Sequence, residues 1–112
     1  MAPDAMIPAL LEQIDELLAS PSSPEEPEVL AHIERTLTDG YAHALSLEAK
    51  RLRLERRMSE LAGELHEGNQ ELKARELGQV SRQLSQNSAD LDTLRATLLQ
   101  LRERATAVRA SV

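Results

Sequence analysis

The feature that most constrains this chain is a seven-residue apolar repeat that runs through most of its length. In the first stretch, apolar residues recur at alternating steps of three and four: Leu30, Ile33, Leu37, Ala44, Leu47, Leu54, Met58, Leu61 and Leu65. A second stretch has the same spacing: Leu77, Val80, Leu84, Leu91, Leu94, Leu98, Leu101, Ala105 and Val108. This pattern is typical of two long helices whose narrow apolar seams face a partner helix. We therefore expect an all-α protein.

The segment between the two stretches predicts a turn. It reads His66-Glu67-Gly68-Asn69-Gln70, in which Gly68 suits the end of one helix and Asn69 the N-cap of the next. The two seams then face each other in an antiparallel coiled-coil helical hairpin over residues 28–112, with the turn near residues 67–70. A parallel two-stranded coil is the alternative.

The first long helix has one weak point. Thr36-Leu37-Thr38-Asp39-Gly40 is a run of poor helix formers that is able to kink or break a helix. The apolar repeat keeps its phase across this run, so we predict one continuous helix from Pro27 to about His66. The second long helix is predicted from about Gln70 to Arg109, which gives the hairpin two arms of similar length.

Folding the chain about Asn69 predicts which seam residues meet. It places Leu47 opposite Leu91, and it brings the two polar interruptions of the seams, Arg51 and Asn87, opposite each other. A polar pair in a leucine seam costs stability but fixes register, so Arg51 and Asn87 form a candidate register-setting layer. The alternative is that Arg51 extends its guanidinium past the core into solvent.

Residues 1–20 predict a short acidic amphipathic helix, followed by a Pro/Ser-rich linker at residues 21–27 that is too rich in proline to continue it. The linker length allows this helix to pack in its own monomer or to swap to a neighbour. We expect it at the end of the hairpin that carries the C-terminal arginines, where its apolar side is able to meet Tyr41, Leu45 and Leu99.

Four large apolar residues lie outside the two-helix seam: Tyr41, Leu45, Leu52 and Leu99. Apolar residues beyond the seam of a hairpin indicate a second contact surface. They are the candidate partner-binding residues, either for an unidentified helical protein or for a homodimer in the form of a four-helix bundle.

Composition narrows the class of function. Tyr41 is the only aromatic residue and there is no cysteine, so disulfides and thiolate metal sites are excluded and a deep ligand pocket is disfavoured. We find no nucleophile motif or phosphate-binding loop in the sequence. We expect no enzymatic activity, no cofactor and no metal. The chain also lacks a signal peptide pattern and an apolar span, which predicts a cytoplasmic protein without membrane insertion.

The formal net charge of −6 is unevenly distributed, because residues 1–34 contain no Lys or Arg. Basic residues gather instead in the middle of the hairpin: Lys50, Arg51, Arg53, Arg56 and Arg57, with Arg82 on the other arm. One hypothesis is an anion-binding module that uses this belt. Nucleic acid is an improbable partner, because the belt is local and aromatic residues for base stacking are missing.

The predicted hairpin tip is acidic. Its exposed residues are Glu67, Gly68, Asn69 and Glu71, which suggests a regulator that inserts its tip into a larger complex. A metal site formed by His66 and the neighbouring acids is disfavoured, because a solvated turn offers few convergent ligands. The reading that fits most of the sequence is a non-enzymatic helical protein–protein interaction module that acts through its coiled-coil faces.

Overall fold

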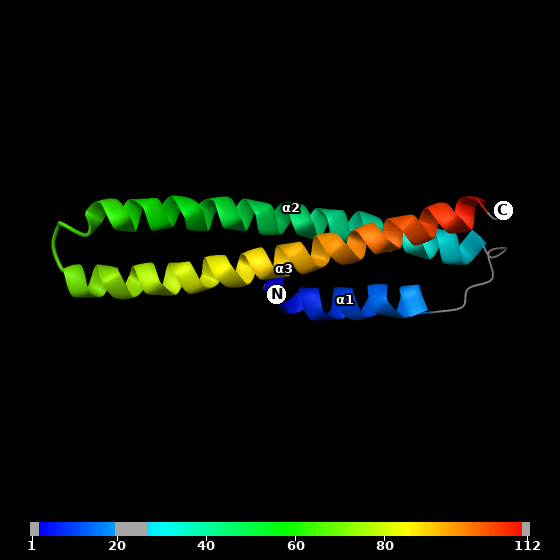
Figure 1. Ribbon diagram of the computed structural model, residues 1–112, viewed down its shortest axis with the longest axis horizontal. Helices are drawn as coiled ribbons and strands as arrows, with labels where there is room; N and C mark the ends of the chain where they lie inside the picture. The colour runs from blue at the N-terminus through cyan, green and yellow to red at the C-terminus, as the bar shows by residue number, and fades with distance from the viewer. Residues whose placement is uncertain (1–2, 20–26, 111–112) are drawn as a thin grey trace.

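The part of the chain that the structure describes forms three helices arranged as a rod. The computed structural model describes residues 3–19 and 27–110. Within them α1 spans Pro3–Ala19, α2 Pro27–Glu64 and α3 Gln70–Ala110, and the molecule measures 65 × 20 × 18 Å. α2 and α3 run side by side in opposite directions, and α1 lies along the half remote from the turn (Figure 1). The predicted all-α helical hairpin is confirmed, and most of the predicted linker lies outside the described residues.

Local chemistry explains where the two long helices end. Gly68 has a φ of 67°, a left-handed conformation that glycine adopts without a Cβ penalty. The Glu67 amide donates to the Glu64 carbonyl at 2.9 Å, which closes the last turn of α2. Asn69 caps α3, since its Oδ1 accepts the Leu72 amide at 3.1 Å. The turn is therefore specified by two neighbouring residues.

α2 passes through its predicted weak point without a break. The hydroxyls of Thr36 and Thr38 donate to the carbonyls of His32 and Glu34, each at 3.0 Å, so both side chains bond within the helix. Gly40 is buried against α3, where an added Cβ would lie 2.3 Å from Leu98 Cδ2. Glycine at this position permits the close approach of the two helices.

Ion pairs join the two long helices on both sides of the seam: Glu34–Arg109, Glu48–Arg95 and Arg57–Glu76. Glu34 and Glu48 each follow a seam residue, whereas Arg57 precedes one. In a heptad repeat these positions flank the seam on opposite sides. The ion pairs on the two sides of the seam are therefore consistent with the register obtained by folding the chain about Asn69.

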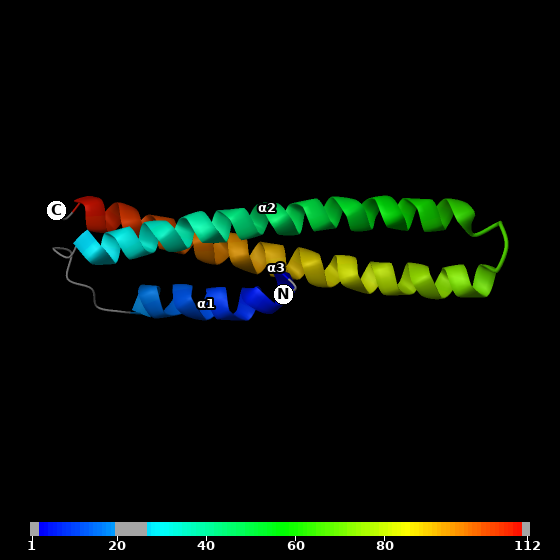
Figure 2. The same ribbon diagram turned by 180° about the vertical axis from the view of Figure 1, so that it is seen from behind.

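α1 packs in its own chain, against both arms of the hairpin. It runs antiparallel to α2 and parallel to α3 in both views (Figures 1 and 2). Its buried anchors are Ile7 and Ile14, and Gln13 Nε2 donates to Thr36 Oγ1 at 3.3 Å.

The expectation that the apolar side of α1 meets Tyr41, Leu45 and Leu99 is wrong, because all three stay exposed. α1 occupies the opposite side of the seam. There the small buried Thr36 leaves room for the helix and offers an acceptor to Gln13.

Burial of the seam changes along the rod. Where α1 adds a third helix, the seam is well buried: Ile33, Leu37, Ala44, Leu47, Leu91, Leu94, Leu98, Leu101, Ala105 and Val108. In the half next to the turn, Leu61 is the buried apolar residue, and the other seam residues there are only half-buried: Leu54, Met58, Leu65, Leu77, Val80 and Leu84. Two helices alone leave this part of the core open to solvent.

Candidate protein-interaction face

An open apolar groove of about 480 Å³ lies between α2 and α3, on the side away from α1. Tyr41, Leu45 and Leu99 form its upper walls and are 42%, 66% and 50% exposed. Ala44 and Leu98 from the seam form its floor. The structure thus brings three of the four predicted partner residues into one groove. Three charged side chains complete the lining: Glu48, Arg95 and Arg102.

Leu52, the fourth predicted partner residue, lies on the same face but outside this groove. It follows Leu45 by one heptad, so both project from the same side of α2. Leu52 is 61% exposed. The ion pair between Glu48 and Arg95 crosses the seam between the groove and Leu52. The apolar surface therefore extends beyond the groove toward the middle of the rod.

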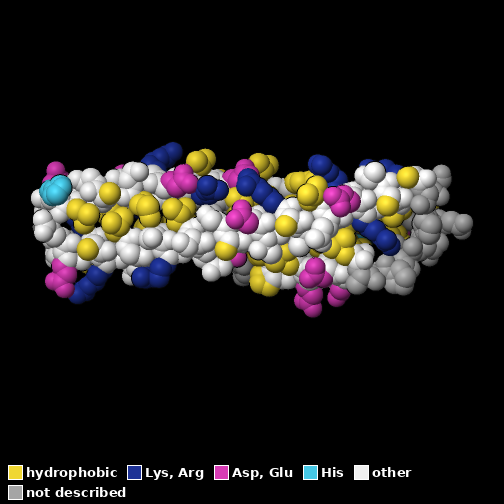
Figure 3. Space-filling model, viewed as in Figure 1, with side chains coloured by type: hydrophobic (Ala, Val, Ile, Leu, Met, Phe, Trp, Pro, Cys, Tyr) yellow, Lys and Arg dark blue, Asp and Glu magenta, His cyan; other side chains and the backbone are white. Residues whose placement is uncertain are grey.

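The same face continues to the turn with small residues. Stepping by sevens from the groove residues toward the turn passes the charged residues Glu55 and Asp92 and otherwise leads to small side chains: Ser59 and Ala62 on α2, and Ala74, Gly78, Ser81, Ser85 and Ser88 on α3. Because these side chains are short, half-buried apolar residues are visible as a row between the two helices (Figure 3). We call this whole side of the hairpin, from the groove at Tyr41 and Leu99 through Leu52 to the small residues next to the turn, the open face. Sequence reasoning missed its small-residue half, although the heptad spacing contains the signal.

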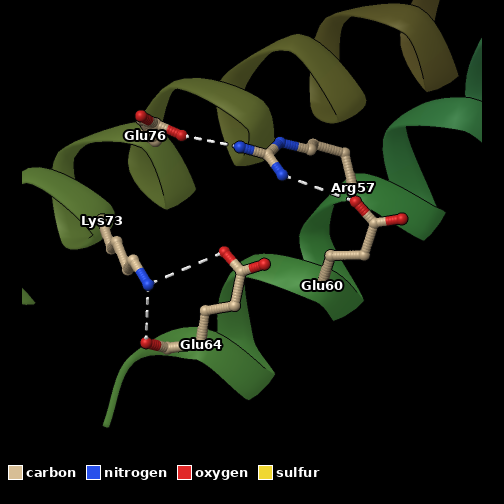
Figure 4. A network of polar contacts seen from close by, with 5 residues as sticks. All are labelled: Arg57, Glu60, Glu64, Lys73 and Glu76. Carbon is tan, nitrogen blue, oxygen red and sulfur yellow. Dashed lines mark hydrogen bonds and ion pairs between the residues drawn. The ribbon is translucent and has the colours of Figure 1, made fainter. Parts of the chain in front are cut away.

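The opposite side of the seam is covered over most of its length, apart from a pocket of about 90 Å³ beside Asn87. α1 covers the half remote from the turn, and charged side chains bridge the other half (Figure 4). There Arg57 bonds Glu76 at 2.9 Å and Glu60 at 3.4 Å, while Lys73 Nζ donates to the Glu64 carbonyl at 3.2 Å.

These contacts stabilise the charged form of Arg57, which an arginine keeps in any case. Desolvation lowers the pKa of the Arg57 guanidinium, but hydrogen bonds to Glu76 and Glu60 outweigh it and raise the pKa above its ordinary value. Arg57 therefore forms a positively charged bridge from α2 to Glu76 of α3 on the covered side. Ion pairs also cross the seam on the open face, at Glu34–Arg109 and Glu48–Arg95, but no third helix covers that face among the described residues.

The predicted polar layer is divided between core and solvent. Asn87 is 3% exposed, and its Nδ2 donates to the Leu47 carbonyl at 3.2 Å. Arg51 turns outward, where its Nε lies 3.0 Å from Glu55 and its side chain is 43% exposed. Asn87 is therefore the polar group inside the seam, and a role for Arg51 and Asn87 in setting register stays a prediction.

The mid-rod basic belt is interleaved with acids. Arg51 pairs with Glu55, and Arg57 pairs with Glu60 and Glu76. Lys50 lines a small pocket of about 90 Å³ with Asp90. The remaining members of the belt are exposed: Arg53, Arg56 and Arg82. The charge of the belt is therefore partly neutralised, since the guanidinium groups of Arg51 and Arg57 are already engaged.

The hairpin tip is exposed, as predicted for Glu67, Gly68, Asn69 and Glu71. Glu71 pairs with Arg75 at 2.9 Å, and the Asn69 side chain serves as the cap of α3. Across residues 3–19 and 27–110, no cluster of three or more His, Asp or Glu is arranged to hold a metal ion. Nor does any helix in this part of the chain combine the length and apolar character needed to cross a membrane.

Comparisons with models of protein families, with curated proteins and with solved structures found no match to this chain.

Proposed function

We propose that this protein is a non-catalytic helical interaction module and that its open face binds another protein. The observation that carries the proposal is the difference between the two sides of the hairpin. Ion pairs cross the seam on both sides, but among the described residues a third helix, α1, covers one side, whereas the other presents Tyr41, Leu45, Leu52 and Leu99 to solvent. A partner helix laid along the seam would bury these residues together.

Energetics favour an occupied open face. Burial of a leucine side chain that was exposed is worth about 1.5–3 kcal/mol. The half-buried seam residues of the two-helix half, such as Leu54 and Leu84, would gain further burial from the same contact. Large exposed apolar patches are uncommon on proteins that act as monomers. The surface therefore has the composition of an interface core surrounded by charged residues.

The anion-binding hypothesis receives less support from the geometry. Arg51 and Arg57 already hydrogen-bond to carboxylates of the same chain, so an anion would have to displace Glu55, Glu60 or Glu76. The tip hypothesis rests on exposure alone, because Asn69 and Gly68 are accounted for by the turn they form. Neither the basic belt nor the hairpin tip therefore supports a binding role as strongly as the apolar groove does.

A site-specific cross-linking experiment tests the proposal. A photo-reactive amino acid replaces Leu45 in one variant and Leu99 in another, expressed in the cells that make the protein. Gln100 is the matched control, because it is exposed and adjacent to Leu99 but points away from the groove. We expect discrete covalent adducts with protein from positions 45 and 99. Equal or absent labelling at all three positions would contradict the proposal.

A further inference from the structure

We propose that the occupant of the open face is a second copy of this chain, packed antiparallel to the first. The inference rests on the proposed interaction role and names its partner. The two copies would form a four-helix bundle from α2 and α3 of each protomer, with one α1 on each outer side. α1 does not obstruct this arrangement, because it lies on the opposite side of the seam.

The two halves of the open face are complementary in size. The half remote from the turn carries the projecting side chains of Tyr41, Leu45 and Leu99. The half next to the turn carries small residues such as Ser59 and Ala74, between which the seam is accessible. A parallel dimer would set the large residues against each other and leave a gap between the small halves. An antiparallel dimer packs each large half onto a small half, as interdigitating cores require.

This matching places the two-fold axis near Leu52. An antiparallel dimer of hairpins sets α2 against α2 of the other copy, and an axis at Leu52 pairs this residue with its own copy. Leu45 then lies level with Ser59 of the other copy, and Tyr41 lies level with Ala62. Leu52 is the large exposed residue at the boundary between the two halves.

Charge at the two ends of the overlap supports the same arrangement, whereas near the axis Glu48, paired with Arg95, lies level with Glu55 of the other copy, paired with Arg51. Arg102 lines the outer end of the groove, and Glu71 lies at the exposed tip. Glu71 is level with Glu67 in the hairpin, about 22 Å from Leu52 at about 1.5 Å per residue. Arg102 is level with Thr36, about 24 Å from Leu52 in the opposite direction. The antiparallel dimer therefore brings Arg102 of each copy to the acidic tip of the other.

The available surface is large enough for a stable dimer. A rod face of 65 × 20 Å corresponds to about 1,300 Å². A standard specific interface buries about 800 Å² on each partner. Full overlap is therefore unnecessary, and the interface can be limited to the stretch between the groove and the tip.

Solution mass provides the first test. Light scattering across a hundredfold range of concentration should give twice the chain mass of 12.4 kDa. Leu45→Glu should raise the dissociation constant of the dimer by at least about tenfold, because it places a charge in the apolar contact. Gln100→Glu adds the same charge outside the face and should leave the dissociation constant unchanged.

Single cysteines test the orientation, since the natural chain contains none. Under mild oxidation Leu52→Cys should form a covalent dimer, because its own copy lies within disulfide reach. Leu45→Cys and Ser59→Cys should each stay uncoupled alone and should couple to each other when mixed. Efficient self-coupling of Leu45→Cys would overturn the antiparallel arrangement.

The outcomes separate this inference from the proposed function. A chain that stays monomeric at every concentration, while photo-adducts at Leu45 contain a different protein, would overturn the second copy and leave the interaction role intact. A dimer that is insensitive to Leu45→Glu would overturn the use of the open face. A monomer that gives no position-specific adducts would contradict both.

Discussion

Two glycines of α2 have opposite surroundings: Gly40 lies in the helix interior, whereas Gly63 is the penultimate residue of the helix. Glycine costs about 1 kcal/mol relative to alanine in a helix interior. At Gly63 an added Cβ would have no neighbour within 4 Å. At Gly40 it would lie 2.3 Å from Leu98 Cδ2 and 3.3 Å from Leu98 Cγ, and Leu98 is 1% exposed. Packing thus requires a glycine at position 40 and not at position 63.

We predict that Gly63→Ala and Gly40→Ala shift stability in opposite directions. Gly63→Ala should raise the free energy of unfolding by about 0.5 kcal/mol, less than in a helix interior because Gly63 lies in the last turn, through helix propensity and a less flexible unfolded chain. Gly40→Ala should lower it by about 1 kcal/mol, because displacement of Leu98 costs about 1–3 kcal/mol and exceeds the gain in propensity. Urea denaturation at one protein concentration measures both. Equal stabilisation by the two substitutions would show that Leu98 adapts without cost.

Asn87 is a buried polar residue, and only one of the two polar atoms of its side chain is hydrogen-bonded. Its Nδ2 bonds to the Leu47 carbonyl, but its Oδ1 is buried without a hydrogen-bond partner. A buried unsatisfied polar atom costs about 1–3 kcal/mol. The position therefore reduces stability, as polar residues that specify register in coiled coils do.

Asn87→Leu should raise the free energy of unfolding by about 1–2 kcal/mol, since it removes the unsatisfied oxygen and fills the seam. Asn87→Ala is the control, because it removes the same oxygen but leaves a cavity, and it should give little or no increase. Thermal unfolding of the three proteins compares them. A loss of stability in Asn87→Leu would mean that the bond to the Leu47 carbonyl is worth more than the unsatisfied atom costs.

The bounds of the long helices could be predicted from the sequence, but the side of the hairpin that α1 covers could not. Pro27, Gly68 and Asn69 act on their own backbone neighbours, so the bounds of α2 and α3 were predictable to within two residues. The side of the hairpin taken by α1 was not. Its apolar stripe fits either groove, and the small buried Thr36 becomes visible only when the helices are placed in space.

Ile14→Ala tests how firmly α1 is attached. Ile14 is fully buried, so its truncation should cost about 2–4 kcal/mol. We expect this loss to appear mainly as faster amide exchange within α1, because α1 contacts the hairpin through one face while α2 and α3 keep their seam. Asp15→Ala, next to Ile14 on the exposed side, is the control and should leave exchange unchanged. Equal acceleration in all three helices would show that α1 unfolds with the whole molecule.

The whole molecule combines two kinds of core. In the half remote from the turn, three helices bury the seam, whereas in the other half two helices leave Leu54, Met58 and Leu77 half-exposed. A thin core loses stability first, so local opening should begin near the turn. If the open face binds a second copy, the small-residue half receives the missing cover from the large residues of that copy.

Amide hydrogen exchange at two protein concentrations measures whether a second copy covers the two-helix half. Below the dissociation constant of the dimer, amides near Leu61 and Leu77 should exchange faster than those near Leu94, because fewer apolar contacts must break to open them. Above it, protection near Leu61 and Leu77 should rise. The second copy binds the closed state, so its binding free energy adds to the free energy that local opening requires. Amides near Ile14, on the opposite side, should change least. A gradient that persists unchanged at both concentrations would mean that the two-helix half remains uncovered, and that its seam is stabilised by the Arg57 and Lys73 ion pairs alone.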